Sequence, residues 1–524
     1  MPTALEIKER KPPLTSLQTR IVRNVFSNWG AYVLAMAVNF FLSPYVVQHL
    51  GNTGYGVWTL ILSLTGYLGL LDLGVRGAVT RYVAKFHTES EHGRASNVAS
   101  SAMFLFSIAG LIAILFSVAA AASVISRMGI PEQYVPAART VLLVTGLNIA
   151  ISLVSGVFGG ILVGLQRFDL TNGIEVSINL LRAATIVFAL HKGAGIVTLA
   201  LIQLGFTLAR LGANAGLARR LYPELEMQLN KIDLAGVRLI FSFSAFSFML
   251  HVSGSLIYAT DNVVIGTFLP VSALTFYVIG GNLAEYTRML VAGISQALMP
   301  LASSIQAGKD EDQLRRVVLF TSRAGTMVVL PIAVTFMLRG STFIRLWMGE
   351  QYADLSGKVL VVLALTLFFW AANSVTAGIL IGLNKHKPLV PALLAEGLCN
   401  LGLSIYLVQR IGILGVAWGT AAPALIATLL FWPWYIQKSL EISPTSYAKS
   451  AWLRPMAAIV PFALGSYLIE RLWPAHHLML FFLQVLLLLP LAAAGYWALC
   501  LDTEHREGIS RKFTQSFVRV FAKG

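Results

Sequence analysis

Two pairs of opposite charges stand within stretches that are otherwise apolar enough to cross a membrane. Asp72 and Arg76 lie four residues apart in the stretch 66–86, and Glu285 and Arg288 lie three residues apart in a second stretch. Residues at these spacings share one helix face and can form an ion pair. A charge near the bilayer centre costs at least about 2.5–3.5 kcal/mol, so it normally faces a bundle interior or a wet cavity. The pairs predict either a polar path through a membrane protein or local ion pairs that hold helices together.

Further polar residues within apolar stretches are candidates for a binding site. Asp261, near the end of a predicted span, joins the two charge pairs as a candidate cavity residue. A second set of candidates comprises Glu175, Asn179, Arg182, Arg210, His251, Glu396 and Asn400. In this second set, hydrogen bonding between helices is the favoured interpretation for the residues at spacings of three and four. A lone arginine could instead bind phosphate, and the histidine could titrate in a proton-coupled cycle.

The composition places these residues in a membrane protein. The chain has 524 residues, of which 56% are hydrophobic and 12% are charged. Soluble proteins carry about 25% charged residues, so the chain is expected to lie in lipid. Cys399 and Cys500 both fall in apolar runs and are expected to be small buried hydrophobes, with no disulfide framework and no metal site.

The apolar segments predict an all-α, polytopic fold. A spanning helix needs about 20 mostly apolar residues, and about fourteen such segments can be counted. They are 24–49, 55–85, 96–125, 137–165, 171–191, 196–218, 238–265, 273–302, 317–339, 357–383, 388–409, 413–437, 453–472 and 478–501.

Basic residues are distributed unevenly between the two sides of the predicted membrane. With the N-terminus placed inside, 25 of the 39 Lys and Arg residues lie in inner segments, 8 in outer segments and 6 within spans. Cytoplasmic loops carry such an excess, so both termini are expected in the cytoplasm and the protein in the inner (plasma) membrane. The net charge of +15 then reflects topology and attraction to anionic lipids, and no nucleic-acid partner is expected.

An internal repeat divides the spans into two groups. The stretch 160–170 matches 378–389, and the Glu-Gln-Tyr triplet at 132–134 recurs at 350–352, in each case 218 residues later. A six-helix unit repeated in this way has parallel halves, with the substrate site between them. The second span of each half carries one of the charge pairs, which favours the cavity interpretation. The predicted domains are a cytoplasmic arm, two six-helix bundles, an extra helix pair and a basic amphipathic tail, at 1–23, 24–220, 238–438, 453–501 and 502–524.

The sequence lacks the motifs of several enzyme classes. It has no Walker motif, no HExxH, no paired CxxC and no nucleophile elbow. A membrane glycosyltransferase is expected to carry catalytic acids on large outer loops, and no predicted outer loop exceeds about twenty residues. We therefore expect neither an enzyme nor a cofactor, and energy from an ion gradient, the membrane potential or the substrate gradient.

Several stretches carry a resemblance to a known family. They are the run GNTGYG at 51–56 with Trp58, the run LLDLGVRGAVTRYVAKF at 70–86, and GILVGLQRF at 160–168. Through them the chain resembles polysaccharide (O-antigen type) flippases of the multidrug/oligosaccharidyl-lipid/polysaccharide exporter superfamily. The resemblance covers residues 24–438 and is strongest over the first two spans.

The resemblance implies a fold, a cargo and roles for the charge pairs. The fold would be two six-helix bundles, as in multidrug exporters, around a central cavity of alternating access. The cargo would be an oligosaccharide linked to undecaprenyl diphosphate, flipped to the outer leaflet for surface polysaccharide biosynthesis. Arg76 and Arg288 would contact the diphosphate, and Asp72 and Glu285 would orient them. Membrane lipids and other glycan assembly proteins are the expected partners. An ion-coupled drug exporter or a peptidoglycan-precursor flippase of the same superfamily stays open.

Overall fold

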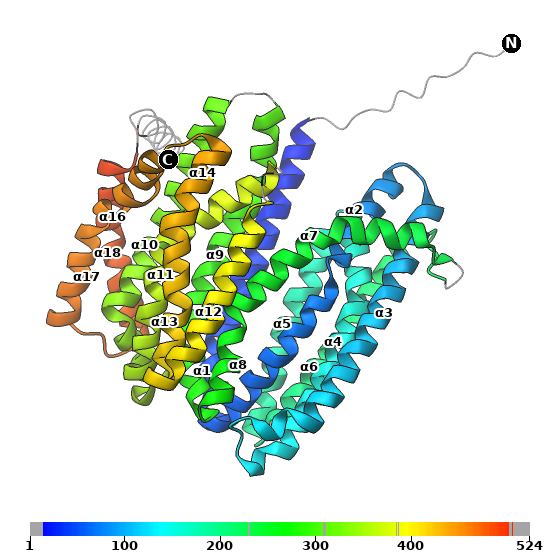
Figure 1. Ribbon diagram of the computed structural model, residues 1–524, viewed down its shortest axis with the longest axis horizontal. Coiled ribbons are helices and arrows are strands. Elements are labelled where there is room, and N and C mark those ends of the chain that lie inside the picture. Colours follow the sequence, from blue (N-terminus) through cyan, green and yellow to red (C-terminus); the bar gives the residue numbers. More distant parts are fainter. Residues whose placement is uncertain are drawn as a thin grey trace, which may run out of the picture. The chain divides into compact units, whose positions relative to one another are not determined.

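The protein is built from helices throughout the part that the structure describes. This computed structural model describes residues 14–228, 231–307, 311–383, 385, 387–501 and 506 (Figure 1). Within them, eleven helical segments are long and apolar enough to cross a membrane, the first of them holding two of the predicted spans. The prediction of an all-α, multi-pass membrane protein is confirmed, and the count of fourteen spans stays a prediction. The predicted tail 502–524 lies outside the described residues, except for Arg506.

The helices follow one another with short connections. The α-helices are α1 (Leu14–Gly66), α2 (Val75–Thr88), α3 (His92–Ser123), α4 (Val135–Gly164), α5 (Phe168–His191), α6 (Ile196–Leu221), α7 (Leu234–Tyr258), α8 (Thr260–Phe268), α9 (Ser272–Ala307), α10 (Glu311–Met348), α11 (Glu350–Gly382), α12 (Leu389–Ile411), α13 (Ile413–Ile426), α14 (Trp432–Leu440), α15 (Pro444–Tyr447), α16 (Arg454–Ala458), α17 (Val460–Leu472) and α18 (Leu478–Leu499). Short 3-10 helices are η1 (Tyr67–Asp72), η2 (Ile125–Arg127) and η3 (Glu132–Tyr134), and π-helical turns are η5 (Ala427–Phe431) and η6 (Ala448–Leu453).

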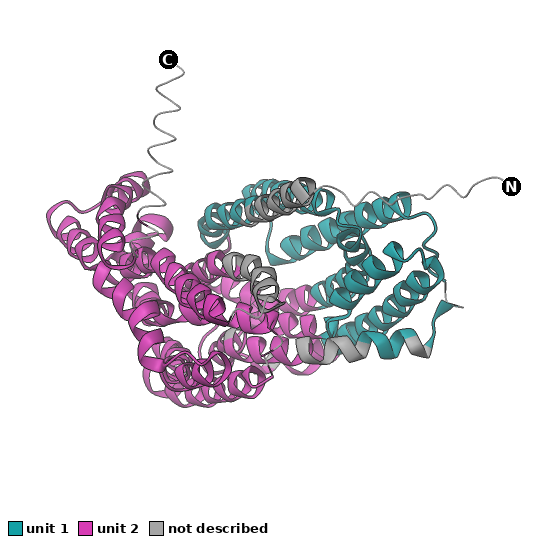
Figure 2. Ribbon diagram, turned by 90° about the horizontal axis from the view of Figure 1, so that it is seen from above, with its two compact units in different colours: residues 1–49, 71–118, 143–247 teal, residues 50–70, 119–142, 248–524 magenta. Residues whose placement is uncertain are grey.

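The chain forms two compact units, and each unit is built from three separate stretches of the sequence (Figure 2). Unit 1 comprises residues 1–49, 71–118 and 143–247, and unit 2 comprises 50–70, 119–142 and 248–524. Four helices, α1, α3, α4 and α7, therefore contribute residues to both units. The unit boundary in α1 falls next to Gly51, whose φ of 69° interrupts the helix. Glycine adopts that conformation without a steric cost.

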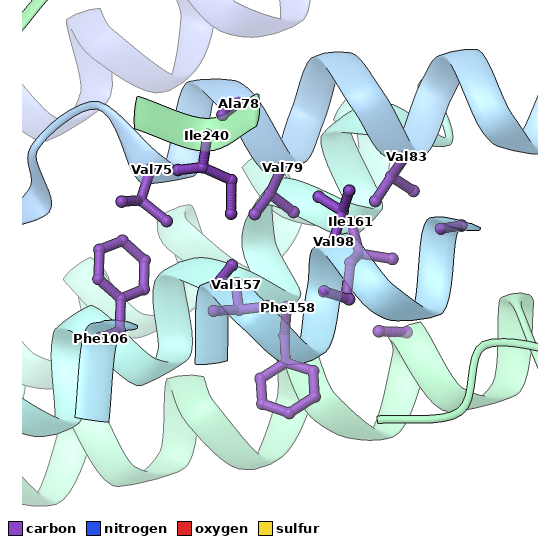
Figure 3. Close-up of a cluster of buried hydrophobic side chains, with 14 of the residues drawn as sticks. Val75, Ala78, Val79, Val83, Val98, Phe106, Val157, Phe158, Ile161 and Ile240 are labelled. Atoms are coloured by element: carbon purple, nitrogen blue, oxygen red, sulfur yellow. The ribbon is translucent and has the colours of Figure 1, made fainter. Parts of the chain in front are cut away.

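Unit 1 has an apolar core between α2, α3, α4 and the first part of α7. Val79 and Val83 of α2 face Val157 and Ile161 of α4 in Figure 3, and all four side chains are buried. The spacing of four in both pairs places them on one face of each helix. Burying a valine or isoleucine side chain contributes about 1.5–3 kcal/mol, so this face fixes α2 against α4.

Unit 2 is organised around α10 and α11, which pack against each other and against α9. The last helices, α16, α17 and α18, pack on the far side of α10, where Phe462 and Leu488 join the core with Leu330. Each π-helical turn lies just before a proline, Pro433 or Pro455. Proline clashes with the carbonyl four residues before it, and a wider turn relieves that clash.

Three predicted spans are interrupted in the structure, and one of them, 453–472, breaks at Ile459 between α16 and α17. The span 55–85 ends as η1 and restarts as α2, after Leu73 at φ 49° and Gly74 at φ 77°. The span 238–265 breaks at Ala259, between α7 and α8. An apolar stretch can lie in the membrane whether its helix is continuous or broken. Apolar composition therefore does not predict where these helices break.

Two predictions of burial were wrong. Cys399 is exposed, because α12 buries the face that carries Gly397, Asn400 and Ser404, and Cys500 is buried as predicted. Arg323 stands near the inner end of the predicted span 317–339, a position from which an arginine side chain is expected to extend to the membrane surface. Its side chain is only 4% exposed, because neighbouring helices cover α10, and it lies 5.8 Å from the ring centre of Phe320.

Candidate functional site

A small polar cavity lies within the membrane-spanning part of unit 2. Its volume is about 210 Å³, and charged or hydroxyl-bearing side chains contribute much of its wall. It is lined by Thr59, Asp261, Asn262, Tyr277, Val278, Gly281, Asn282, Glu285, Arg288, Leu363 and Thr420. The structure thus brings together three of the residues predicted for the site, namely Asp261, Glu285 and Arg288.

Arg288 is the cation of this cavity. It lies on α9, its side chain is 12% exposed, and its Nη1 is 3.2 Å from Oε2 of Glu285. It also interacts electrostatically with Asp261 of α8 and Glu396 of α12. A guanidinium with three carboxylates in range is held in the membrane interior by local charge, and its planar fork can bind an oxyanion with two parallel hydrogen bonds.

Asp261 is the centre of a buried hydrogen-bond network. Its Oδ2 accepts hydrogen bonds from the Tyr277 hydroxyl and, at 2.6 Å, from the Thr420 hydroxyl. Asn400 donates to Thr420 Oγ1 at 3.2 Å and to the Ile257 carbonyl at 2.9 Å. Asn400 therefore joins the predicted site through the network rather than through the cavity wall.

The second oxygen of Asp261 has no hydrogen-bond donor among the described residues. The residue is only 4% exposed, and Oδ1 is buried. A buried carboxylate oxygen without a donor is costly. It is also a position at which a proton, a water molecule or a cation would be stabilised. Among the described residues there is no group of three His, Cys, Asp or Glu side chains suited to a metal ion.

The predicted charge pair in unit 1 is also present. Arg76 Nε is 3.5 Å from Asp72 Oδ2, and the Arg76 amide donates to Asp72 Oδ1 at 3.4 Å. The two residues belong to η1 and α2 rather than to one α-helix, so the pair forms across the interruption at Leu73 and Gly74. The Arg76 side chain is 53% exposed, which leaves its guanidinium accessible.

A glycine stripe on α4 explains how α2 approaches so closely. A Cβ atom at Gly160 would lie 3.2 Å from the Arg76 carbonyl oxygen, and one at Gly164 would lie 2.9 Å from that of Thr80. The Thr80 hydroxyl donates to the Gly160 carbonyl at 3.2 Å. Small residues at this spacing let two helix backbones approach closely, and here the approach places Arg76 against Gly156.

The remaining candidates of unit 1 form a cluster between α5 and α6. Arg182 donates to Asn179 at 2.9 Å and to Gln203 at 2.8 Å. Arg210 was expected to stand alone, but its Nε lies 3.1 Å from Oε1 of Glu175 on the neighbouring helix. The cluster links two helices of one unit, as in the hydrogen-bonding interpretation.

His251 lies on the exposed surface of α7, and its proposed titration stays a hypothesis.

Sequence reasoning missed several residues of the site. Tyr277 and Thr420 bond to Asp261 from positions 16 and 159 residues away. Neither residue is charged, and neither repeats at helical spacing with Asp261. The only available signal was a hydroxyl within an apolar span, which is common in membrane helices.

The stretch GNTGYG, at 51–56, is a packing centre of unit 2. The Tyr352 hydroxyl donates to the side chain of Asn52, and Thr275 donates to the Asn52 carbonyl at 2.7 Å. A Cβ atom at Gly56 would lie 2.1 Å from the Val271 carbonyl oxygen, so only glycine fits there. These contacts give the stretch a structural role, distinct from the cavity.

Comparison with known proteins identifies the family. A family model described as "Polysaccharide biosynthesis protein" matches residues 21–306, which is more than half of the chain. The chain belongs to the polysaccharide biosynthesis protein family. This membership confirms the resemblance to polysaccharide flippases that residues 51–56 and 70–86 carry. A second model, MatE, matches residues 251–406 of this polysaccharide biosynthesis protein.

Relatives and solved structures agree with the family and the fold. The polysaccharide biosynthesis protein is 23% identical to a "Putative O-antigen transporter" of Shigella flexneri, over 78% of this chain and 96% of the relative. It is 20% identical to the "Uncharacterized membrane protein EpsK" of Bacillus subtilis, over 83% and 87%. A solved structure of the "Lipid II flippase MurJ, inward closed conformation" matches with a TM-score of 0.67 at 15% identity, over 91% of this chain and 99% of that one. An inward-facing MATE family transporter matches with a TM-score of 0.65 at 16% identity, over 82% and 99%. The fold is therefore the one shared by these MATE and lipid II flippase structures.

Proposed function

We propose that this protein moves a polyprenyl-diphosphate-linked oligosaccharide from the inner to the outer leaflet by alternating access, for surface polysaccharide biosynthesis. Membership of the polysaccharide biosynthesis protein family and the similarity to an O-antigen transporter support the cargo class. The similarity to a "Probable flippase AglR" of Haloferax volcanii, 19% identical over 66% of this chain and 69% of that one, supports the flippase reaction. The observation that carries the proposal is Arg288, a cation in the wall of an intramembrane cavity.

The residues divide the work between recognition and positioning. Arg288 and Arg76 each contact the diphosphate during the transport cycle, because a guanidinium matches phosphate oxygens bidentately. Glu285 and Asp72 each hold the arginine of their own pair in place. Asp261 holds Arg288 by charge from a second helix. The reaction makes and breaks no covalent bond, so these residues need only bind and orient the cargo.

The proposal includes a location and a domain organisation. The protein lies in the inner (plasma) membrane with both termini in the cytoplasm, as the excess of basic residues on one side favours. The transport bundles are residues 24–220 and 238–438, followed by the helix pair 453–501. Its partners are the lipid-linked cargo, membrane lipids and other glycan assembly proteins.

The test is a deletion strain complemented with variants. Deletion is expected to remove surface glycan and to trap lipid-linked oligosaccharide on the cytoplasmic side. Arg288→Ala and Arg76→Ala are expected to fail to restore export at normal protein levels, and Arg288→Lys to restore it in part, because lysine keeps the charge without the fork. Arg345→Ala, near the end of α10 where the arginine pairs loosely with Glu350 at 3.9 Å, is the matched control. Normal export by both alanine variants would reject these roles.

A second candidate function comes from the same superfamily. The MatE match over residues 251–406 favours an ion-coupled drug exporter, and the lipid II flippase fold favours a peptidoglycan-precursor flippase. Drug tolerance of the deletion strain separates the first from the leading proposal. An exporter changes drug tolerance and leaves surface glycan intact.

A further inference from the structure

A second and larger cavity lies at the end of the C-terminal helices of unit 2. Its volume is about 910 Å³, and it shares no lining residue with the intramembrane cavity. It is lined by Thr445, Ala448, Lys449, Leu453, Arg454, Ala457, Ala498, Leu499, Leu501 and Arg506. These residues come from α15, η6 and α16 on one side and from α18 and the chain after it on the other.

The cavity lies beside a close contact between two helices. A Cβ atom at Gly495 would lie 1.9 Å from the Ala458 carbonyl oxygen, so α16 and α18 are in backbone contact there. The lining residues of α18 are at its C-terminal end, whereas the loop that joins α17 to α18 lies at its N-terminal end (Figure 1). Ala457 and Ala498 line the cavity, and their small methyl groups leave it open.

The wall of this cavity carries three cations and no acidic residue among the described residues. They are Lys449, Arg454 and Arg506. Arg506 is fixed by hydrogen bonds from its guanidinium to the carbonyls of Leu501 and Ala498, at 2.9 and 2.8 Å. Lys449 is exposed and makes no hydrogen bond or ion pair with the described residues. Leu453 and Leu499, 60% and 49% exposed, extend the apolar part of the wall outward.

We propose that this cavity binds the headgroup of an anionic phospholipid. The Lys449 ammonium would contact the phosphate, Arg454 and Arg506 would add positive charge to the wall, and the acyl chains would run along the exposed leucines. The cavity lies at the helix ends that the distribution of basic residues assigns to the cytoplasmic side. Basic pockets between transmembrane helices on that side are suited to anionic headgroups. This site is independent of the proposed cargo and of the intramembrane cavity.

The C-terminal end of the chain is an alternative occupant of this cavity, and its charge argues against it. The residues after Arg506 carry one acid, Glu507, and four bases, Arg511, Lys512, Arg519 and Lys523, so their net charge is positive. Inserting them would bring like charges together, which is unfavourable near apolar walls of low dielectric constant. A lipid phosphate brings the opposite charge and carries its own acyl chains.

The test measures lipid binding to the full-length protein in detergent by native mass spectrometry. Phosphatidylglycerol and phosphatidylcholine with identical acyl chains are titrated separately. We expect phosphatidylglycerol to bind one site at least tenfold more tightly than phosphatidylcholine. Lys449→Gln should weaken phosphatidylglycerol binding about fivefold, the effect of one basic residue near an anionic membrane surface. Ala498→Leu should weaken it by filling the cavity without changing the charge. Both positions are exposed, so neither variant should unfold the protein.

Controls identify the source of the phosphate. Lys438→Gln removes an exposed lysine of α14 outside the cavity and should leave binding unchanged. Equal binding of the two lipids, or an equal loss in Lys438→Gln, would overturn the proposal. Displacement of the lipid by millimolar inorganic phosphate would assign the site to free phosphate instead. Displacement by an equal concentration of a polyprenyl diphosphate would assign it to the cargo, and either result would reject the phospholipid.

Discussion

The guanidinium of Arg76 lies against the backbone of Gly156, where a methyl group would come within 2.9 Å of Nη2. The same stripe of α4 contacts the backbone of α2 at Gly160 and Gly164. One helix surface therefore serves two purposes. It lets two helices pack closely, and it gives one arginine side chain the space in which to lie.

The glycines of the stripe should differ when each is replaced by alanine. Gly156→Ala meets the flexible end of Arg76, so stability should stay level or rise by up to about 1 kcal/mol, the helix gain of alanine over glycine. Glycan export should fall because the guanidinium moves. Gly164→Ala meets the Thr80 carbonyl at 2.9 Å and should cost about 1–3 kcal/mol through forced separation of the helices. Thermal unfolding of the purified variants and export assays check this, and equal melting temperatures would contradict it.

The sequence predicts features that depend on local spacing. The pair of Asp72 and Arg76, the pair of Glu285 and Arg288 and the glycine stripe of α4 all repeat at three or four residues, and the structure contains all of them. The interruption at Leu73 and Gly74 was not predicted, because an apolar stretch gives no information about one or two backbone angles.

Features that depend on tertiary contacts could not be predicted. The network of Asp261, Tyr277 and Thr420 joins three helices whose packing no local pattern encodes. The pair of Arg210 and Glu175 likewise required the approach of two helices. Uncharged hydroxyls are inexpensive in a membrane helix, so they stand out less in a sequence than charges do.

Reversing the charges of Glu285 and Arg288 tests whether this pair binds the cargo or only stabilises the structure. In Glu285→Arg/Arg288→Glu the ion pair can re-form with its ends exchanged, so a purely structural pair should restore function. We expect the double variant to fold and to remain inactive, because the guanidinium no longer lies where the phosphate binds. Export and melting temperature are the measurements. The same reversal at Asp354 and Lys358, an exposed pair at 2.8 Å, should preserve both, and restored export in the cavity variant would refute the phosphate contact.

The two hydroxyls on Asp261 should be energetically coupled. Tyr277→Phe and Thr420→Val each remove one donor from the same carboxylate oxygen, Oδ2. Each should lower stability by about 1.5–3 kcal/mol, the range for hydrogen bonds to charged groups. Groups in one hydrogen-bond network are non-additive by about 0.5–3 kcal/mol. Thermal unfolding of the two single variants and the double variant measures the coupling, and simple additivity would show that the network does not act as a unit.

A buried ion pair attaches the C-terminal helices to α10. Arg339 is 1% exposed, its Nε donates to Glu470 of α17 at 2.7 Å, and it also bonds to Gln484 of α18. Arg339→Met should cost about 3 kcal/mol, because it leaves a carboxylate without its partner. Arg339→Met/Glu470→Leu should be more stable than Arg339→Met alone. Melting temperatures check both expectations, and a double variant that is less stable than the single one would contradict the account.

The control for this pair lies on the surface. Lys358→Met breaks the exposed pair with Asp354, where double-mutant cycles give less than about 1 kcal/mol. If Lys358→Met lowered stability as much as Arg339→Met, the burial of an ion pair would not determine how much its loss destabilises the protein.

Because α17 and α18 are attached to α10, a spectroscopic label on α18 can report how α10 moves. Leu486 is 61% exposed on α18, on a helix that Gln484 joins to Arg339. A nitroxide or fluorophore at that position would travel with α10, because the buried contacts leave the helix pair little freedom of its own. Distances recorded from such a label would report the movements of α10 during a transport cycle without placing a probe in either cavity.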